Sequence, residues 1–183
     1  MCYIFVLPDA NLYRSIIDLF AAGTDTTATT LDWALMFMIA YPGMQDKCRK
    51  EIEDVIPLGV PHMLAKDIKI NGYAVPKGTM LLSNQQAIHF NKSYWDEPAK
   101  FNPERFLDAD GNIKKTDKLI PFSVGPRICL GESLARMELF LFFANLIQRF
   151  TFTKAEEDDI LDFNGVLGVT LRTKPYKLRV KVN

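Results

Sequence analysis

The chain has 183 residues, of which 48% are hydrophobic, and its 22 lysines and arginines balance its 22 aspartates and glutamates. This composition is typical of a soluble globular protein with one large core or two small ones, and it excludes disorder as the main state. A net charge of zero provides no overall positive field, which argues against nucleic acid as a partner. The cysteines Cys2, Cys48 and Cys129 are too few and too scattered for a disulfide framework or a four-ligand zinc site, so we expect a reducing compartment.

Helical patterns occupy three parts of the chain. The apolar start at 2–7 is too short for a membrane span or a secretory signal, so we expect no anchor in this chain. Residues 11–40 then predict a long helix with apolar side chains on more than one face, which we expect to be buried. A charged amphipathic helix is predicted over about 44–55, and a second buried helix over 131–150.

Short alternating stretches after Pro57 predict strands. Residues 68–70 and 73–75 flank Asn71-Gly72, a good hairpin signal. The fold class is therefore mainly α with small β hairpins. The remaining expectations are a strand at 79–82, an ordered loop over 94–106, an acidic loop at 156–162 and a basic alternating strand at 177–182.

The loop 122–131 holds two glycines six residues apart, Gly125 and Gly131, around Arg127 and Cys129, and it leads directly into a predicted helix. A helix N-terminus and a guanidinium both favour thiolate over thiol, so Cys129 is predicted to be a metal ligand or a nucleophile. Glycines there permit positive φ and let backbone N–H groups approach the sulfur. The alternative is a buried cysteine on an ordinary turn.

The segment 22–27, Ala-Gly-Thr-Asp-Thr-Thr, interrupts the apolar pattern of the first helix. Glycine and threonine are poor helix formers, and the polar side chains compete for backbone hydrogen bonds, so a local break or widening is expected. On a wall facing a cofactor, the break would present an acid and an alcohol, as a proton relay requires. The alternative is that the helix starts here, capped by Thr24 or Asp25.

These two motifs and the stretch 101–106, Phe-Asn-Pro-Glu-Arg-Phe, occur in the order found in the C-terminal part of a cytochrome P450. The chain from about Asn11 onward resembles this family of haem-thiolate monooxygenases, most closely its animal microsomal members. The resemblance implies a partial cytochrome P450 fold and a single truncated domain over 1–183. In it, 1–56 form the long central helix and the charged helix, and 57–183 form the hairpins, the Cys loop, the proximal helix and a C-terminal hairpin.

The resemblance also implies chemistry. A haem b iron with Cys129 as axial thiolate would use O2, and electrons from NADPH through a flavoprotein reductase, to insert one oxygen atom into a small apolar substrate. The family implies the cytosolic face of the endoplasmic reticulum membrane. The alternative is a non-catalytic truncated or splice product that lacks a productive haem site.

Other site residues are implied by position. Arg127 and His62 match partners of the haem propionates, and Phe122 would pack beside the proximal haem face. Asp25 and Thr26 match the acid and alcohol that help deliver protons to dioxygen. His62 could instead be an ordinary turn histidine. Four apolar residues would line the substrate pocket or else be plain core: Leu58, Val60, Val166 and Leu167.

One family motif is absent from the sequence. The family holds its haem-side core with a Glu-x-x-Arg helix, and no arginine here has a glutamate three residues before it. The match breaks between Ile56 and Pro57, and the family's N-terminal half also has no counterpart. We therefore expect Arg105 to lose both partners and, if buried, to be an uncompensated charge. We also expect the long helix to lose its cover, which would expose Trp33, Leu35, Met36 and Phe37.

Overall fold

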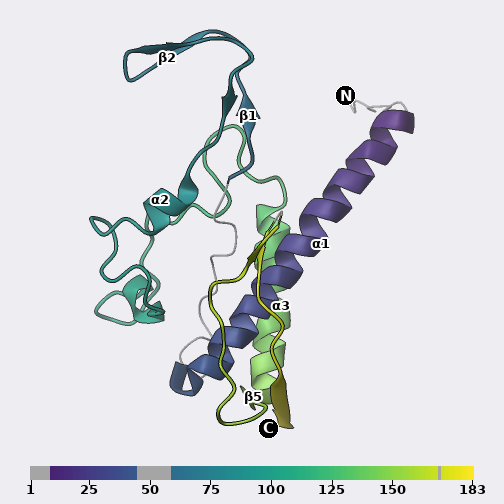
Figure 1. The fold of residues 1–183 in the computed structure, drawn as a ribbon, viewed down its shortest axis with the longest axis vertical. Helices are drawn as coiled ribbons and strands as arrows, with labels where there is room; N and C mark the ends of the chain where they lie inside the picture. The colour runs from purple at the N-terminus through teal and green to yellow at the C-terminus, as the bar shows by residue number, and fades with distance from the viewer. Residues whose placement is uncertain (1–8, 45–58, 169) are drawn as a thin grey trace. The chain divides into compact units, whose positions relative to one another are not determined.

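A computed structural model describes residues 9–44, 59–168 and 170–183. It divides into two compact units, one within Met1–Val55 and Gly131–Asn183 and the other within Ile56–Leu130. The described elements are two long helices, short helical turns and four two-stranded antiparallel sheets (Figure 1). The predicted class, mainly α with small β hairpins, is confirmed.

Helix α1 (Asp9–Ala40) confirms the predicted long helix, and the short 3-10 helix η1 (Pro42–Met44) follows it. The expected break at 22–27 is wrong, and so is a start at Thr24 or Asp25, because the helix is continuous through this segment. The hydroxyl of Thr26 donates to the Ala22 carbonyl at 2.7 Å, and that of Thr30 to the Thr26 carbonyl at 2.8 Å. Bonding back to the preceding turn satisfies the hydroxyls without interrupting the backbone ladder.

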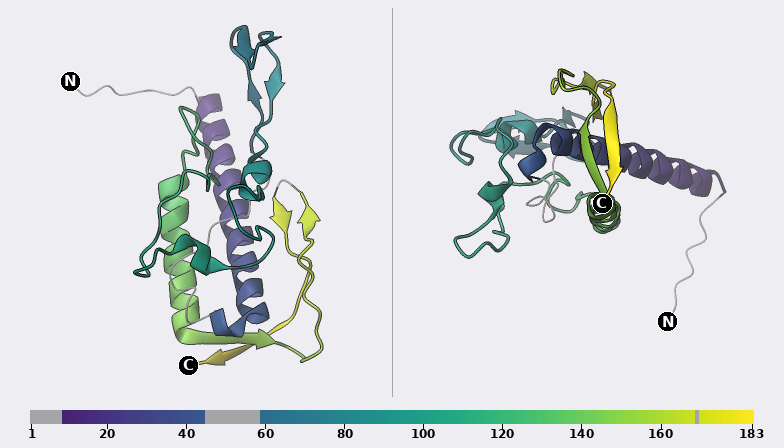
Figure 2. Two further views of the ribbon diagram at one scale, coloured as in Figure 1. Left: turned by 90° about the vertical axis from the view of Figure 1, so that its left-hand side faces the viewer. Right: turned by 90° about the horizontal axis from the view of Figure 1, so that it is seen from below.

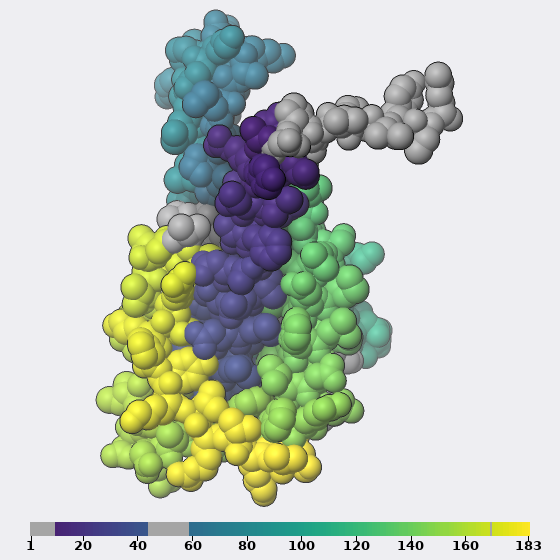
Figure 3. Space-filling model, turned by 90° about the vertical axis from the view of Figure 1, so that its right-hand side faces the viewer, coloured from purple at the N-terminus to yellow at the C-terminus, as the bar shows by residue number. Residues whose placement is uncertain are grey.

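Only the C-terminal half of α1 is buried. Trp33 and Met36 are 7% and 0% exposed, and Leu35 and Phe37 are half-buried, so the expectation that these residues lose their cover is wrong. Helix α3 and the C-terminal strands flank this half of α1 (Figure 3). The N-terminal half corrects the prediction of a fully buried helix, because its large apolar residues are exposed: Leu12, Tyr13, Ile16, Ile17, Leu19 and Phe20.

Helix α3 (Glu132–Arg149) lies beside α1 and leads directly into strand β5 (Phe150–Lys154), which pairs antiparallel with β8 (Leu178–Val182) (Figure 2). These elements contribute Phe143, Ile147 and Phe152 to the core. The prediction of a buried helix is right for this face only. The other side of α3 exposes Leu134, Met137, Phe140, Leu141 and Phe142.

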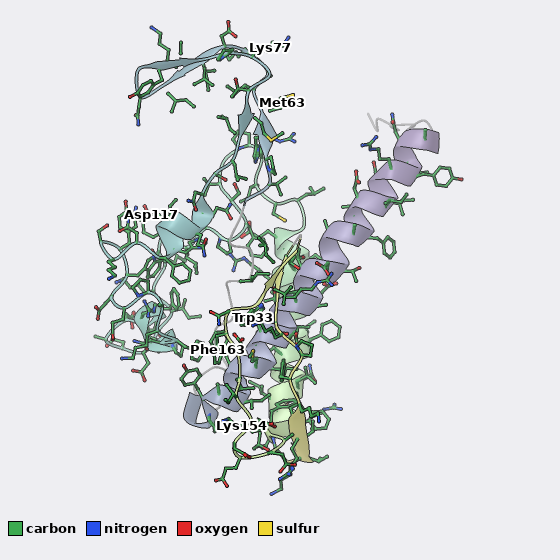
Figure 4. The ribbon with its side chains drawn as sticks, viewed as in Figure 1. Trp33, Met63, Lys77, Asp117, Lys154 and Phe163 are labelled. Carbon is green, nitrogen blue, oxygen red and sulfur yellow. The ribbon has the colours of Figure 1, made fainter. Side chains whose placement is uncertain are left out.

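A small hairpin of β6 (Val166–Leu167) and β7 (Leu171–Arg172) is hydrogen-bonded to α1. The indole N–H of Trp33 donates to the Leu171 carbonyl at 2.7 Å. The Tyr176 hydroxyl donates to Asp32 Oδ1 at 2.9 Å, and the Thr173 hydroxyl also bonds Asp32. Phe163, in the loop before the hairpin, packs on Phe37 with ring centroids 5.2 Å apart (Figure 4).

The second unit begins with two antiparallel pairs. Strand β1 (His62–Met63) pairs with β4 (Met80–Leu81), and β2 (Ile68–Ile70) pairs with β3 (Tyr73–Val75). The predicted hairpin is confirmed, because Asn71 and Gly72 have φ of 48° and 86°, as a two-residue turn of this kind requires.

Helix α2 (Gln85–His89) and an ordered loop follow, as predicted for 94–106, and the loop ends in the 3-10 helix η3 (Pro103–Phe106). Arg105 is half-buried and donates to the carbonyls of four residues at 2.8 to 3.1 Å: Asp96, Glu97, Lys100 and Asn102. The expectation applied to a buried Arg105, whereas the side chain is only half-buried; four carbonyls satisfy its hydrogen bonds but carry no net negative charge.

Two further expectations concern the charged helix and a membrane-spanning segment. The charged helix predicted at 44–55 lies almost wholly outside the described residues. No helix within 9–44, 59–168 and 170–183 is both long and apolar enough to cross a membrane.

Burial along α1 makes a testable prediction. Met36→Ala should lower the free energy of unfolding by about 2–5 kcal/mol, because it removes a fully buried side chain and leaves a cavity. Leu19→Ala, on the exposed half of the same helix, should change it by no more than about 0.5 kcal/mol. Urea denaturation of the two variants checks this, and equal losses would contradict the burial described here.

Candidate functional site

The loop that carries Cys129 is closed by its own backbone. The N–H of Cys129 donates to the Phe122 carbonyl at 2.9 Å, and that of Ile128 donates to the Gly125 carbonyl at 3.1 Å. Earlier in the same loop, the Ser123 N–H donates to the Ile120 carbonyl at 3.0 Å. These bonds fold the loop into two turns that end at the thiol.

The two glycines of the loop have different roles. Gly125 has φ of 84°, a conformation that residues with side chains rarely adopt and that glycine permits. A Cβ at Gly125 would meet no atom within 4 Å, so backbone conformation and not crowding requires glycine. Gly131 has φ of −87° and is the N-cap residue of α3, so it does not use the positive φ that glycine permits.

Cys129 is a free cysteine with an exposed side chain. This excludes the alternative of a buried, packed cysteine. Arg127, two residues earlier, is also exposed. A thiol on an open, glycine-containing turn is sterically accessible to a large planar group, and thiolate sulfur is a soft ligand that suits haem iron. The exposed sulfur donor therefore fits the cofactor that the resemblance implies.

Two other predicted cofactor residues lie in the same unit as Cys129. Phe122 is half-buried, and its carbonyl accepts the bond from Cys129 described above. His62 is half-buried in β1, where it pairs with Leu81 of β4. His62 is therefore a strand residue and not a turn histidine.

The predicted substrate-lining residues are exposed where they are described. Val60 is 74% exposed, Val166 51% and Leu167 69%, which excludes plain core roles for these three. Val166 and Leu167 form strand β6 of the hairpin that contacts α1. Leu58 lies outside the described residues.

Asp25 lies in the middle of α1 and bonds to the C-terminal hairpin. Its Oδ2 accepts from the Thr170 hydroxyl at 2.7 Å, and its Oδ1 accepts from Arg172 Nη2 at 2.5 Å. The hydrogen bond from Thr170 lowers the pKa of Asp25; partial burial opposes this, and the bond and charge of Arg172 lower the pKa further. Asp25 is therefore a carboxylate that two hydrogen bonds, from Thr170 and Arg172, hold in a fixed position.

Thr26 follows Asp25 in sequence but has a different partner. Its hydroxyl donates to the Ala22 carbonyl, inside the helix, at 2.7 Å. Within the described residues, no hydrogen bond joins the two side chains, although they belong to consecutive residues of one helix. The hydroxyl oxygen of Thr26 keeps lone pairs that can still accept a hydrogen bond.

Sequence reasoning did not identify Thr170 and Arg172. Thr170 is 2% exposed, and its hydroxyl also lies 3.4 Å from that of Thr29, which is 6% exposed. A carboxylate only accepts, so the single proton of Thr170 goes to Asp25, and Thr29 must donate to Thr170. The sequence offers only a weak indication of these two residues: they are polar and occupy alternate positions of the expected C-terminal hairpin.

The held carboxylate predicts a pH dependence of stability. A folded-state pKa below the unfolded value stabilises the chain above the unfolded pKa, about 4, and this contribution is lost as the pH falls through the folded pKa. Asp25→Asn should therefore lower Tm at pH 7, and the gap from the wild type should narrow below about pH 4. Arg172→Met should show a smaller gap with the same trend. Parallel Tm curves from neutral to acid pH would contradict this account.

Comparison with known proteins agrees with the resemblance. The family model for cytochrome P450 matches residues 6–58 and 53–180. Rat cytochrome P450 2D4 is 40% identical over 201 residues, and human cytochrome P450 2D6 is 39% identical; each match covers 93% of this chain and 40% of the relative. A solved Zebra fish cytochrome P450 with abiraterone has a TM-score of 0.79 at 35% identity, covering 91% of this chain and 47% of that one.

The same comparisons describe what the chain spans. It covers about 40% of the length of the curated relatives it matches. The two segments of the family match overlap at 53–58. An alignment over 201 residues is longer than a chain of 183, so at least 18 positions of the rat relative have no counterpart here. A family match across nearly the whole described chain shows that this protein belongs to the cytochrome P450 family.

Proposed function

We propose that this chain is the C-terminal part of a haem-thiolate monooxygenase that inserts one oxygen atom of O2 into a small apolar substrate. Electrons would come from NADPH through a flavoprotein reductase. The carrying observation is the exposed, free Cys129 on a loop closed by its own backbone bonds. By family, the enzyme would act at the cytosolic face of the endoplasmic reticulum membrane, and the two units would be parts of one haem domain.

Residues of the second unit would hold haem b. Cys129 would be the axial ligand, Arg127 and His62 would bind the propionates, and Phe122 would pack on the ring. When bound, haem supplies oxygen activation, which an electron-rich thiolate ligand promotes. The positive φ of Gly125 supports this proposal, because it turns the chain so that Cys129 N–H bonds to Phe122 and the thiol stays exposed.

Residues of the first unit would handle protons, and residues of both units would contact the substrate. Asp25 would hold a proton-accepting carboxylate at a position fixed by Thr170 and Arg172. Thr26 would accept a hydrogen bond from a water, while its own hydroxyl proton remains hydrogen-bonded to the Ala22 carbonyl. The exposed apolar side chains of Val60, Val166 and Leu167, together with Leu58, would contact the substrate and exclude water.

A second function is favoured by a specific observation. The Glu-x-x-Arg helix has no counterpart in the sequence, and the family match divides at 53–58. On this basis we propose as the alternative a non-catalytic truncated or splice product without a productive haem site. Such a product would compete with an intact enzyme for reductase or haem, or would be degraded.

The carbon-monoxide difference spectrum of the reduced, haem-reconstituted chain tests the first proposal. We expect a red-shifted Soret band that requires thiolate ligation and is therefore lost in Cys129→Ser. Cys48→Ser is the matched control and should keep the band. Absence of the band in the wild-type chain would reject the monooxygenase and favour the non-catalytic product.

The proton-handling role of Thr26 makes a separate prediction. Thr26→Val keeps the side-chain shape but removes the hydroxyl, so product formation with reductase should fall by about 100-fold, a typical contribution of a positioned proton donor or acceptor. Thr26→Ser keeps the hydroxyl and should retain most of the rate. Equal turnover of the two variants, measured at saturating reductase, would remove Thr26 from the mechanism.

A further inference from the structure

We propose that His89 is a positioning residue for the Cys129 loop, because its imidazole Nε2 accepts the backbone N–H of Ile120 at 3.0 Å. His89 ends helix α2, whereas Ile120 lies 31 residues later at the start of the turn that leads to Cys129. The hydrogen bond is therefore a tertiary link within the second unit. Its consequence for haem ligation rests on the proposed function, whereas the link itself does not.

The acceptor side of this link is well defined. His89 is half-buried, and burial lowers its pKa, which keeps the imidazole neutral at pH 7. For Nε2 to accept a hydrogen bond, the neutral ring must carry its proton on Nδ1. An apolar side chain at this position would leave the half-buried Ile120 N–H without an acceptor from α2.

Helix α2 is itself fixed to the core of the second unit. The Asn84 side chain accepts from the Ala87 N–H at 3.0 Å and caps the helix. The indole of Trp95, 9% exposed, donates to the Ile88 carbonyl at 3.2 Å, next to His89. Trp95 in turn contacts Phe106, with ring centroids 5.5 Å apart. His89 therefore projects from an anchored support.

The loop side of the link continues without a gap to the thiol. Ile120 uses both backbone groups: its N–H binds His89, and its carbonyl accepts from Ser123. Ser123 has φ of 66° and follows Phe122, whose carbonyl accepts from Cys129. Fixing Ile120 fixes the first turn, and the first turn sets the acceptor to which the Cys129 N–H bonds.

The test uses haem-free chain of full length, with Cys2 and Cys48 replaced by serine so that only Cys129 reacts. Amide hydrogen exchange should show protection of the Ile120 N–H in the wild type and its loss in His89→Leu. Alkylation of Cys129 by iodoacetamide should be about 2- to 10-fold faster in His89→Leu, as expected for one lost hydrogen bond. His89→Gln keeps an acceptor near the Nε2 position and should restore most of both values.

An unprotected Ile120 N–H in the wild type would overturn the proposal even if His89→Leu fails to fold. Equal changes in His89→Leu and His89→Gln would also overturn it, because they would indicate packing and not hydrogen bonding. Gln86→Ala, an exposed position on α2, is the matched control and should behave as wild type. A protected Ile120 with no haem band would reject the proposed function alone, whereas an intact haem band with an unprotected Ile120 would reject only the role of His89.

Discussion

The buried C-terminal half of α1 is the surface on which the first unit is built. Met36 and Met38 are 0% and 1% exposed, and α3, β5 and the C-terminal hairpin all contact this helix. Packing of this half of α1 also determines a hydrogen bond. It buries the Trp33 indole, and a buried indole N–H without an acceptor would cost about 1–3 kcal/mol. Trp33 therefore needs the Leu171 carbonyl as acceptor. That hydrogen bond places the hairpin beside α1, where Thr170 and Arg172 donate to the Asp25 carboxylate. Packing and electrostatics at this surface specify the same hairpin position.

In the second unit, backbone hydrogen bonds and not side-chain packing shape the Cys loop. Cys129 is exposed, so no core holds it in place. Its position depends on its N–H bond to Phe122, on the positive φ of Gly125 and on the turn that begins at Ile120. These backbone bonds hold the loop in a conformation that leaves the sulfur exposed.

The sequence predicted those elements whose formation depends on neighbouring residues in the chain. Helix α1 and the Asn71-Gly72 hairpin follow from apolar periodicity and turn chemistry, and both are observed. The predicted break at 22–27 failed because propensity cannot show that Thr26 and Thr30 bond back to the preceding turn. Partners far apart in the chain were also invisible: Asp25 with Arg172 and His89 with Ile120 depend on tertiary contacts that no spacing rule encodes. The three motifs pointed to the cytochrome P450 family because each is a run of consecutive residues, and the comparisons confirm that family.

Arg105 bears on the choice between the two proposed functions. Loss of the Glu-x-x-Arg helix predicted an orphaned guanidinium, yet its donors bind four carbonyls of its own loop. Carbonyl dipoles satisfy hydrogen bonds but carry no net negative charge, so the loop can keep its conformation while a positive charge remains half-buried at a cost in free energy. The bonds that shape the Cys loop involve His89, Ile120, Phe122 and Gly125, and none of them uses Arg105. The absence of a Glu-x-x-Arg motif from the sequence therefore bears on the 94–106 loop more directly than on the Cys loop, whose hydrogen bonds are formed without Arg105.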